Sequence, residues 1–138
     1  MKRLCVIDGQ GGGIGSAIIK QLKERLGETV SIWALGTNAI ATSQMLKAGA
    51  NRGASGENAI VQNASRADLI IGPIGILIAH AMMGELTPGM AEAVATSPAR
   101  KFLLPITQEN IEVVGVASNP LPHLIESLVE KHLKPHLI

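Results

Sequence analysis

The chain has 138 residues, of which 17% are charged and 46% are hydrophobic, and its formal net charge is +1. This length and apolar content suit one domain with a buried core, over residues 1–138, and they exclude a disordered chain. Lys and Arg are scattered singly or in pairs, so the sequence offers no basic surface for nucleic acid or an anionic membrane. We therefore expect no nucleic-acid or membrane partner.

Fifteen glycines stand beside one Trp, one Phe and no Tyr. The absence of Tyr excludes every mechanism that uses a phenol as acid, base or nucleophile. The single cysteine, Cys5, excludes an internal disulfide and favours a reducing compartment, so we expect a cytoplasmic protein. The apolar run that follows Met1 is too short for a signal peptide. The longest apolar stretch, Leu69–Met83, is too short to span a bilayer, so we expect core or subunit interface there.

The first half of the chain predicts alternating strands and helices. The apolar run Arg3–Ile7 is typical of a central strand buried on both faces. Ile14–Leu26 has apolar residues every four positions and ends before Gly27, which predicts an amphipathic helix. Thr29–Leu35 predicts a second strand, and Asn38–Ala48 is compatible with a helix. This βαβα order predicts a parallel sheet with right-handed crossovers.

The middle of the chain predicts a loop, a helix and a third strand. Arg52–Gly56 is expected to be a flexible loop in which Ser55 caps a helix from about Glu57 to Ala64. Asp68–Ile71 predicts the third strand. The segment that follows, Ile74–Met83, is expected to form an apolar helix of about two turns. Another helix is predicted to begin at Pro88, with Thr87 as its cap.

The last third predicts two strands and a helix. Lys101–Leu104 and Ile111–Ala117 are the predicted fourth and fifth strands, and too few residues separate them for a crossover helix, so we expect an antiparallel hairpin. A final helix is predicted to begin near Pro120–Pro122 and to bury Leu124, Ile125, Leu128, Val129 and Leu133. The expected fold is α/β, with three layers and a mostly parallel sheet of about five strands.

A glycine-rich loop joins the first strand to the first helix. Its residues are Asp8, Gly9, Gln10, Gly11, Gly12, Gly13, Ile14 and Gly15. A loop in this position brings backbone N–H groups and the positive end of a helix dipole toward an anion. The loop therefore predicts a site for a phosphate-bearing ligand, whereas the simpler alternative is a turn that only packs helix on strand.

The spacing of Gly9, Gly13 and Gly15, with Ile14 between the last two, resembles the cofactor loop of the short-chain dehydrogenase/reductase family. The resemblance implies NAD(P) or another adenine nucleotide as ligand, with Gly9 making the turn, Gly13 admitting the pyrophosphate and Gly15 packing helix on strand. Asp8 stands where that family has a neutral residue, and it would repel a pyrophosphate unless it bonds the loop's own amides. The family's catalytic Tyr-x-x-x-Lys is absent, so its redox chemistry is excluded.

The loop also looks like that of the chromosome-partitioning ATPase family. Both lysines and the magnesium-binding hydroxyl of that family are missing, so ATP hydrolysis is disfavoured. NAD-binding folds usually carry an acidic residue near the end of the second strand to hold the ribose. Here that stretch reads Gly36-Thr37-Asn38, with no acid and no Arg, so only Thr37 or Asn38 could bond a ribose.

Ligands of open parallel sheets bind at the carboxyl ends of the strands. We therefore add Gly36, Thr37, Asn38, Arg52, Asn58, Gly72 and Pro73 to the candidate site. Arg52 is the expected cation, although a solvated surface charge is the simpler interpretation. His80 is more typical of a buried or interface residue than of a base. His132 and His136 have the spacing of a metal pair but no third ligand, so we expect no metal.

Three motifs together, D-G-Q-G-G-G-I-G, G-T-N-A and G-P-I-G, resemble a family of short bacterial proteins described only as a domain of unknown function. The resemblance implies a Rossmann-like fold and no activity. Our first hypothesis is a nucleotide-binding homo-oligomer without its own redox catalysis. The alternatives are a small enzyme for a phosphorylated or carboxylated metabolite, using Asp8, Arg52, Asn58 and His80, and a structural or regulatory subunit that docks through Ile74–Met83.

Overall fold

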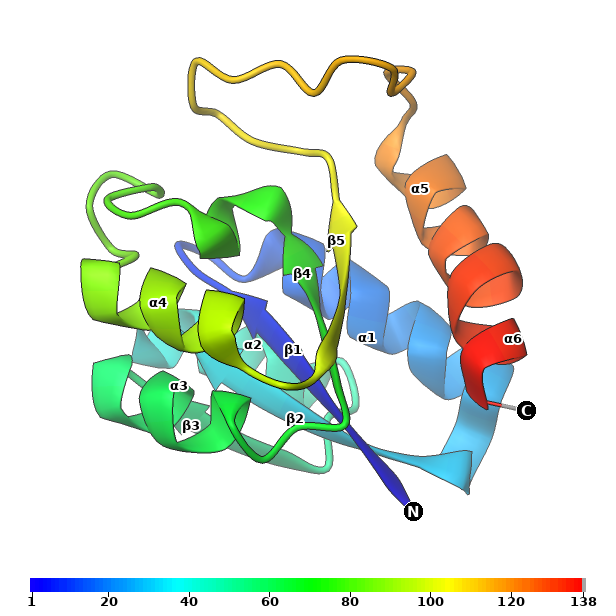
Figure 1. Ribbon diagram of the computed structural model, residues 1–138. Coiled ribbons are helices and arrows are strands. Elements are labelled where there is room, and N and C mark those ends of the chain that lie inside the picture. The colour runs from blue at the N-terminus through cyan, green and yellow to red at the C-terminus, as the bar shows by residue number, and fades with distance from the viewer. Residues whose placement is uncertain (138) are drawn as a thin grey trace.

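The computed structural model describes residues 1–137 as a parallel β-sheet with helices packed on both faces (Figure 1). The strands are β1 (Lys2–Asp8), β2 (Val30–Gly36), β3 (Arg52–Ser55), β4 (Leu69–Pro73) and β5 (Arg100–Leu104). The α-helices are α1 (Gly13–Leu26), α2 (Ala39–Lys47), α3 (Glu57–Ala64), α4 (Pro88–Thr96), α5 (Leu121–Ser127) and α6 (Lys134–Leu137). Two 3₁₀ turns (Gly27–Thr29 and Ile74–Leu77) and a π-helical segment (Leu128–Leu133) complete the elements.

The strands lie in the order β3-β2-β1-β4-β5, and every pairing is parallel. β1 is central and pairs with β2 on one side and β4 on the other. Its side chains alternate across the sheet, so that Leu4 and Val6 belong to one core cluster while Cys5 and Ile7 belong to the other. A strand has to be apolar where both of its faces are buried, and Leu4–Ile7 of β1 meets this condition.

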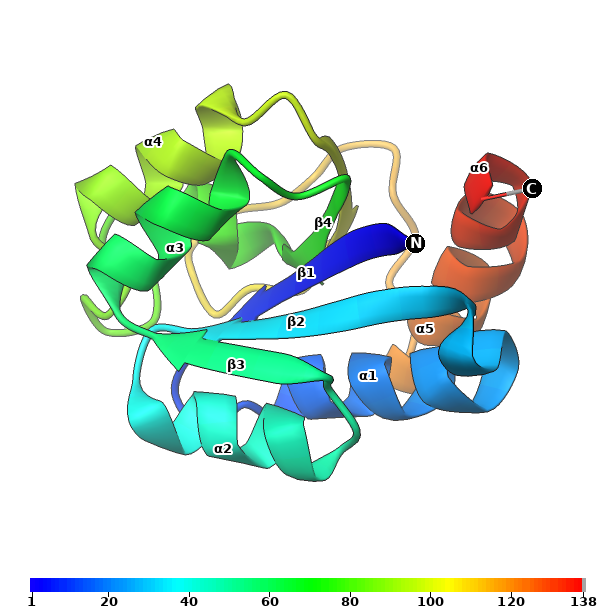
Figure 2. The same cartoon turned by 90° about the horizontal axis from the view of Figure 1, so that it is seen from below.

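Two groups of helices cover the sheet (Figure 2). The core on one face includes Ile18 and Leu22 of α1, Met45 of α2 and residues of the C-terminal helical segment. The core on the other face includes Ile60 of α3 and Val94 of α4. With the sheet between them, the two sets of helices form a three-layer α/β fold.

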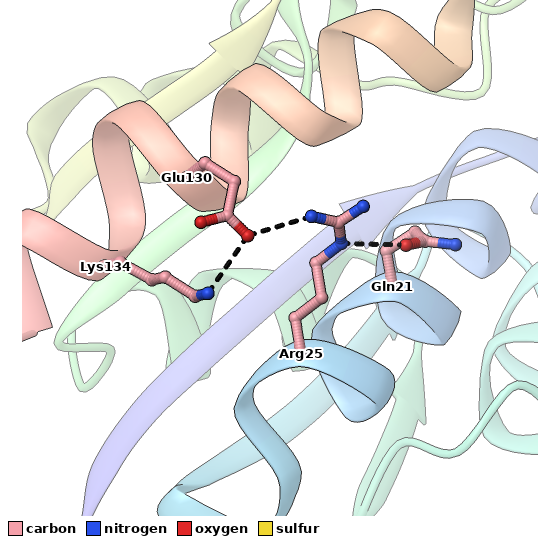
Figure 3. Close-up of polar contacts among 4 residues, drawn as sticks. All are labelled: Gln21, Arg25, Glu130 and Lys134. Carbon is pink, nitrogen blue, oxygen red and sulfur yellow. Dashed lines mark hydrogen bonds and ion pairs between the residues drawn. The ribbon is translucent and has the colours of Figure 1, made fainter.

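The C-terminal helical segment docks on α1, and a polar network marks the contact (Figure 3). The Glu130 carboxylate accepts from the Arg25 guanidinium at 2.8 Å and from the Lys134 ammonium at 3.0 Å. The Nε of Arg25 also donates to the side-chain oxygen of Gln21 at 3.1 Å. These groups are exposed, so the network orients the helices while the apolar residues beneath it supply most of the stability.

Several local predictions are confirmed. Gly27 ends α1 with a φ of 58°. The helix expected over Asn38–Ala48 is present over Ala39–Lys47, and Asn38 caps it by accepting from the N–H of Ala41 at 2.8 Å, a role that the sequence did not predict. The Thr87 hydroxyl oxygen caps α4, accepting from the N–H of Met90 at 3.1 Å, and a proline follows it at the first helical position. Each cap satisfies a backbone N–H that the helix itself leaves unpaired.

The prediction of a flexible loop at Arg52–Gly56 is wrong, because Arg52–Ser55 forms β3 and pairs with Trp33–Gly36 of β2. The strand is short and mostly exposed, so its sequence lacks the apolar run that marks buried strands. The predicted cap is also wrong. Gly56 precedes α3, and the Ser55 hydroxyl donates to Thr42 Oγ1 at 2.7 Å.

The predicted apolar helix Ile74–Met83 is wrong beyond its first turn. Ile74–Leu77 is a 3₁₀ turn, and turns follow it up to Leu86. His80, Met82 and Met83 have φ between 57° and 69°, which a right-handed helix does not allow. Because Ile76 and Ala81 are buried inside this same chain, no apolar helix is presented there for docking.

The predicted hairpin of Lys101–Leu104 with Ile111–Ala117 is wrong, because only the first of the two forms a strand. Residues 105–120 form a long irregular segment, and β5 is parallel to β4. A pattern of β-branched residues predicts strand propensity but does not supply a pairing partner. Among residues 1–137, no helix is long and apolar enough to cross a membrane.

Candidate functional site

The candidate site lies where the chain changes direction across the sheet. From β1 the chain proceeds to β2 on one side, and β4 later pairs with β1 on the other side. In open α/β sheets the crevice at such a switch point, at the carboxyl ends of the strands, is where ligands bind. The glycine loop after β1 and the Gly72-Pro73 end of β4 meet there.

Asp8 ends β1 and turns its carboxylate back into the glycine loop. One oxygen accepts from the N–H of Gly9 at 2.8 Å, and the other accepts from the N–H of Gly15 at 2.7 Å. Burial raises the pKa of Asp8 above its ordinary value, and the bonds from Gly15, Gly9 and Ile14 oppose that rise. Asp8 therefore occupies two loop amides that the sequence offered to a phosphate.

Glu85 reaches the same edge from the irregular segment between β4 and α4. Its Oε1 accepts from the N–H of Gln10 at 2.8 Å, the hydroxyl of Thr37 at 2.6 Å and the side-chain amide of Asn38 at 2.8 Å. Partial desolvation raises the pKa of Glu85, but these three hydrogen bonds outweigh it and hold the pKa below its ordinary value. The structure thus places an ionised carboxylate at the end of β2.

The loop holds its shape through a turn in which the N–H of Gly12 donates to the carbonyl of Gly9 at 2.9 Å. Gly12 has a φ of 72°, and a Cβ there would lie 2.8 Å from the carbonyl oxygen of Ala41. Gly11 and Gly13 are exposed, with no atom within 4 Å of where a Cβ would stand. Within residues 1–137 their N–H groups have no hydrogen-bond partner.

Gly15 packs closely, as the loop spacing implies. A Cβ at Gly15 would lie 2.5 Å from the sulfur of Met45 and 3.0 Å from the Cβ of Asp8. Helix α1 therefore approaches both β1 and α2 at this point. One turn into the same helix, the hydroxyl oxygen of Ser16 is buried and has no partner among the described residues.

A cavity of about 100 Å³ opens beside the loop. Its walls come from the loop, the end of β4, Met82 and the segment Ile106–Glu109. The N–H of Met82 donates to the Glu109 carboxylate at 3.2 Å, which joins two of these walls. Drug-sized ligand pockets usually measure at least about 300 Å³, so this cavity suits part of a ligand.

Three candidate residues do not join the site as expected. Arg52 begins β3, away from its carboxyl end, and its guanidinium lies 5.5 Å from the centre of the Trp33 ring. Asn58 lies exposed in the first turn of α3. His80 was expected to be a buried or interface residue, and the buried position is wrong because the residue is exposed in this chain. The enzyme hypothesis therefore lacks the convergence it required.

Gly36 and Gly72 lie at the edge but serve packing. A Cβ at Gly36 would collide with Thr42, and one at Gly72 would lie 2.5 Å from the carbonyl oxygen of Ile7. Pro73 lines the cavity, as do Asp8, Gln10 and Ile14. Thr37 and Asn38 are at the edge and bond Glu85.

Sequence reasoning missed three residues of this edge: Glu85, Met82 and Glu109. All three lie in irregular segments, and no periodicity predicts where those segments fold. The one available signal is that Glu85 is the first acidic residue after Asp68, at the end of an otherwise apolar stretch.

The remaining candidate residues have structural roles. Cys5 is fully buried, and desolvation raises the pKa of its thiol to about 12. His132 and His136 pack around the Phe102 ring, at 6.3 and 5.7 Å between ring centroids. Within the described part of the chain, no group of three or more His, Cys, Asp or Glu side chains could hold a metal ion.

The fold and this loop define the protein as a Rossmann-like α/β protein with a glycine-rich strand-to-helix turn. A family model described as "Domain of unknown function (DUF3842)" matches residues 3–136, so the chain belongs to that family. No curated protein matches it significantly. Among solved structures, it is similar to a dodecameric FMN-dependent UbiX-like decarboxylase from Escherichia coli O157:H7. The TM-score is 0.47 and the sequence identity 15%, over 100% of this chain and 95% of that one.

Proposed function

We propose that this protein binds a nucleotide, a dinucleotide or another phosphate-bearing ligand at the Gly9–Gly15 loop, without redox catalysis of its own. The observation that carries the proposal is the exposed, unpartnered pair of N–H groups on Gly11 and Gly13, at the amino end of α1. Such N–H groups and the helix dipole together favour an anion. The 14-residue length of α1 is ample for this effect.

Asp8 does not oppose this use of the loop as strongly as its charge suggests. Two backbone N–H groups already bond its carboxylate, and its side chain is buried beneath the loop. A phosphate would therefore contact the outer surface of the turn, at Gly11 and Gly13. The amides of Gly9 and Gly15 stay with Asp8.

Glu85 supports a ribose-bearing ligand. NAD-binding folds hold the ribose hydroxyls with an acidic residue at the end of the second strand. In this chain Glu85 brings a carboxylate to that place from another part of the sequence, and Oε2 is left without a protein partner within residues 1–137. An ionised carboxylate there accepts from free hydroxyls and repels a 2′-phosphate, so we propose NAD or another adenine nucleotide in preference to NADP.

The cavity beside the loop would take only one part of such a ligand. At about 100 Å³ it is smaller than a nucleotide pocket, so most of the ligand would lie across the open edge of the sheet. The contact between Met82 and Glu109 bounds this cavity, and its opening would enlarge the site.

Calorimetric titration with NAD, NADP, AMP and 2′-deoxy-AMP tests the proposal. We expect NAD and AMP to bind the wild type, with NADP and 2′-deoxy-AMP weaker, and Glu85→Gln to reduce the preference for NAD over NADP. Arg52→Ala is the matched control and should bind as the wild type does, because its side chain packs on Trp33. If no compound binds the wild type or raises its Tm as mass action requires, the proposal is wrong.

A further inference from the structure

The outer edge of β5 lines a groove on the side of the sheet opposite to β3. β5 is the last strand of the sheet, and six consecutive residues, Arg100–Pro105, line a groove of about 320 Å³. The opposite wall belongs to the C-terminal helical segment and includes Leu124, Leu128 and His132. Neighbouring strands lie about 4.8 Å apart, so an open strand edge facing a helix wall is a suitable place for one more strand.

The walls of this groove combine apolar and polar surface, and one end is basic. Phe102 and Leu104 are buried in the core beneath it, while Arg100 and Lys101 lie at its beginning. Among the residues described, neither cation takes part in an ion pair. A second hollow continues past Arg100 and is lined by Lys131. A segment that fits here is therefore β-prone, apolar and acidic.

The chain carries a segment of that composition and leaves it uncovered. All residues from Ile111 to Pro120 are exposed, and four of the first six are aliphatic and β-branched. Val114 is 95% exposed, Val116 48% and Ile111 44%. Glu112 lies among them, with Glu109 just before, so the segment has the acidic charge that the groove lacks.

We propose that this segment of one copy adds a strand to the β5 edge of a second copy, and that the exchange is reciprocal. Residues that are β-branched favour strands once a partner edge is available, and main-chain hydrogen bonds supply the affinity. Glu112 and the uncovered aliphatic side chains complement the cations and the apolar floor of the groove. A reciprocal exchange closes a two-fold dimer and removes both open edges.

The path of the chain favours pairing of this segment with β5 of a second copy over pairing with β5 of its own chain. Residues Ile106–Glu109 line the cavity at the carboxyl edge, and Glu109 accepts from the N–H of Met82. Figure 1 shows the segment that follows passing over that edge of the sheet before the chain returns to α5. It therefore extends away from the groove in its own copy.

The mass in solution tests this proposal. We expect light scattering to give twice the chain mass of 14.4 kDa for the wild type. The double variant Val113→Lys with Val114→Lys should raise the Kd for dimerisation on the order of a hundredfold or more, since a strand seated in the groove would place at least one added ammonium group, without a partner, beside Arg100 and Lys101. Both side chains are exposed in one copy, so the fold should persist in circular dichroism. Ile40→Lys replaces an aliphatic residue that is 67% exposed outside the segment, and it should leave the Kd unchanged.

Hydrogen exchange identifies the occupant of the groove. Amides in residues 111–116 should be protected at high protein concentration and lose that protection on dilution. Protection that does not change with concentration means that the segment pairs within its own chain, and it overturns the proposal. A wild type that stays monomeric at its solubility limit, or a dimer that the double variant leaves unchanged, also overturns it.

Discussion

The hydroxyl of Thr37 donates to the carboxylate of Glu85 at 2.6 Å, although 48 residues separate the two in the chain. This bond, with those from Gln10 and Asn38 to the same oxygen, ties the segment before α4 to the ends of β1 and β2. An acidic residue that is missing from the end of the second strand is thus supplied by a distant part of the sequence.

Glu85→Gln should make the free energy of unfolding less sensitive to pH in the acid range. The folded pKa of Glu85 is below its ordinary value of 4.5, so the unfolded state binds more protons between these two values. The stabilisation is therefore fully present above pH 4.5 and is lost as pH falls through the folded pKa. Urea unfolding of the wild type and of Glu85→Gln should be measured from pH 7 to pH 3. The difference between their free energies of unfolding should close below about pH 4.5. A gap that stays constant over this range contradicts the prediction.

Asp8→Asn should destabilise the glycine loop. The amide side chain keeps one acceptor but points a donor at the N–H of Gly9 or Gly15, which leaves a buried group unsatisfied at a cost of roughly 1–3 kcal/mol. Burial raises the folded pKa of Asp8 above its ordinary 3.8, so the folded state binds more protons in that window. Wild-type stability from this group is then greatest below pH 3.8 and falls as pH rises through the folded pKa. Chemical unfolding should show that Asp8→Asn has a lower free energy of unfolding than the wild type at pH 7. This difference should widen as the pH is lowered through this window.

Gly15→Ala and Gly11→Ala should distinguish a glycine that is needed for close packing from a glycine that faces open space. The new Cβ at Gly15 would press on Met45 and Asp8, and overpacking of this kind costs about 1–3 kcal/mol. At Gly11 the space is open, so the same substitution should change stability by less than about 0.5 kcal/mol. Thermal unfolding of both variants measures the difference. Equal losses at the two positions would show that the close approach at Gly15 does not limit stability.

The sequence predicted the elements whose neighbours are local. α1 follows from its periodicity and from Gly27, and α4 follows from Thr87 and Pro88, and each of these signals acts within one turn of its own helix. β1 follows from its apolar run because a central strand has no polar face to interrupt it. The glycine loop is recognisable because its strand and helix are adjacent in sequence.

The sequence did not predict features that depend on distant contacts. β3 is an exposed edge strand, and its pairing with β2 cannot be read from the residues of Arg52–Ser55. Ile111–Ala117 has strand propensity, but within residues 1–137 it pairs with no other strand. Glu85 enters the site through a segment with three non-glycine residues at positive φ, which tertiary packing imposes against local preference.

Cys5 should be unreactive until the whole domain unfolds. It lies fully buried in the central strand, and a thiol whose pKa is raised to about 12 has almost no thiolate at pH 8. Because β1 pairs on both sides, Cys5 becomes accessible only when the sheet separates. A thiol reagent should therefore label no group in the native protein and one per chain in urea. The exposed variant Met83→Cys should label one thiol at once under native conditions, since that side chain is 93% exposed. Labelling of native wild type at the rate of this variant would mean that β1 opens without global unfolding.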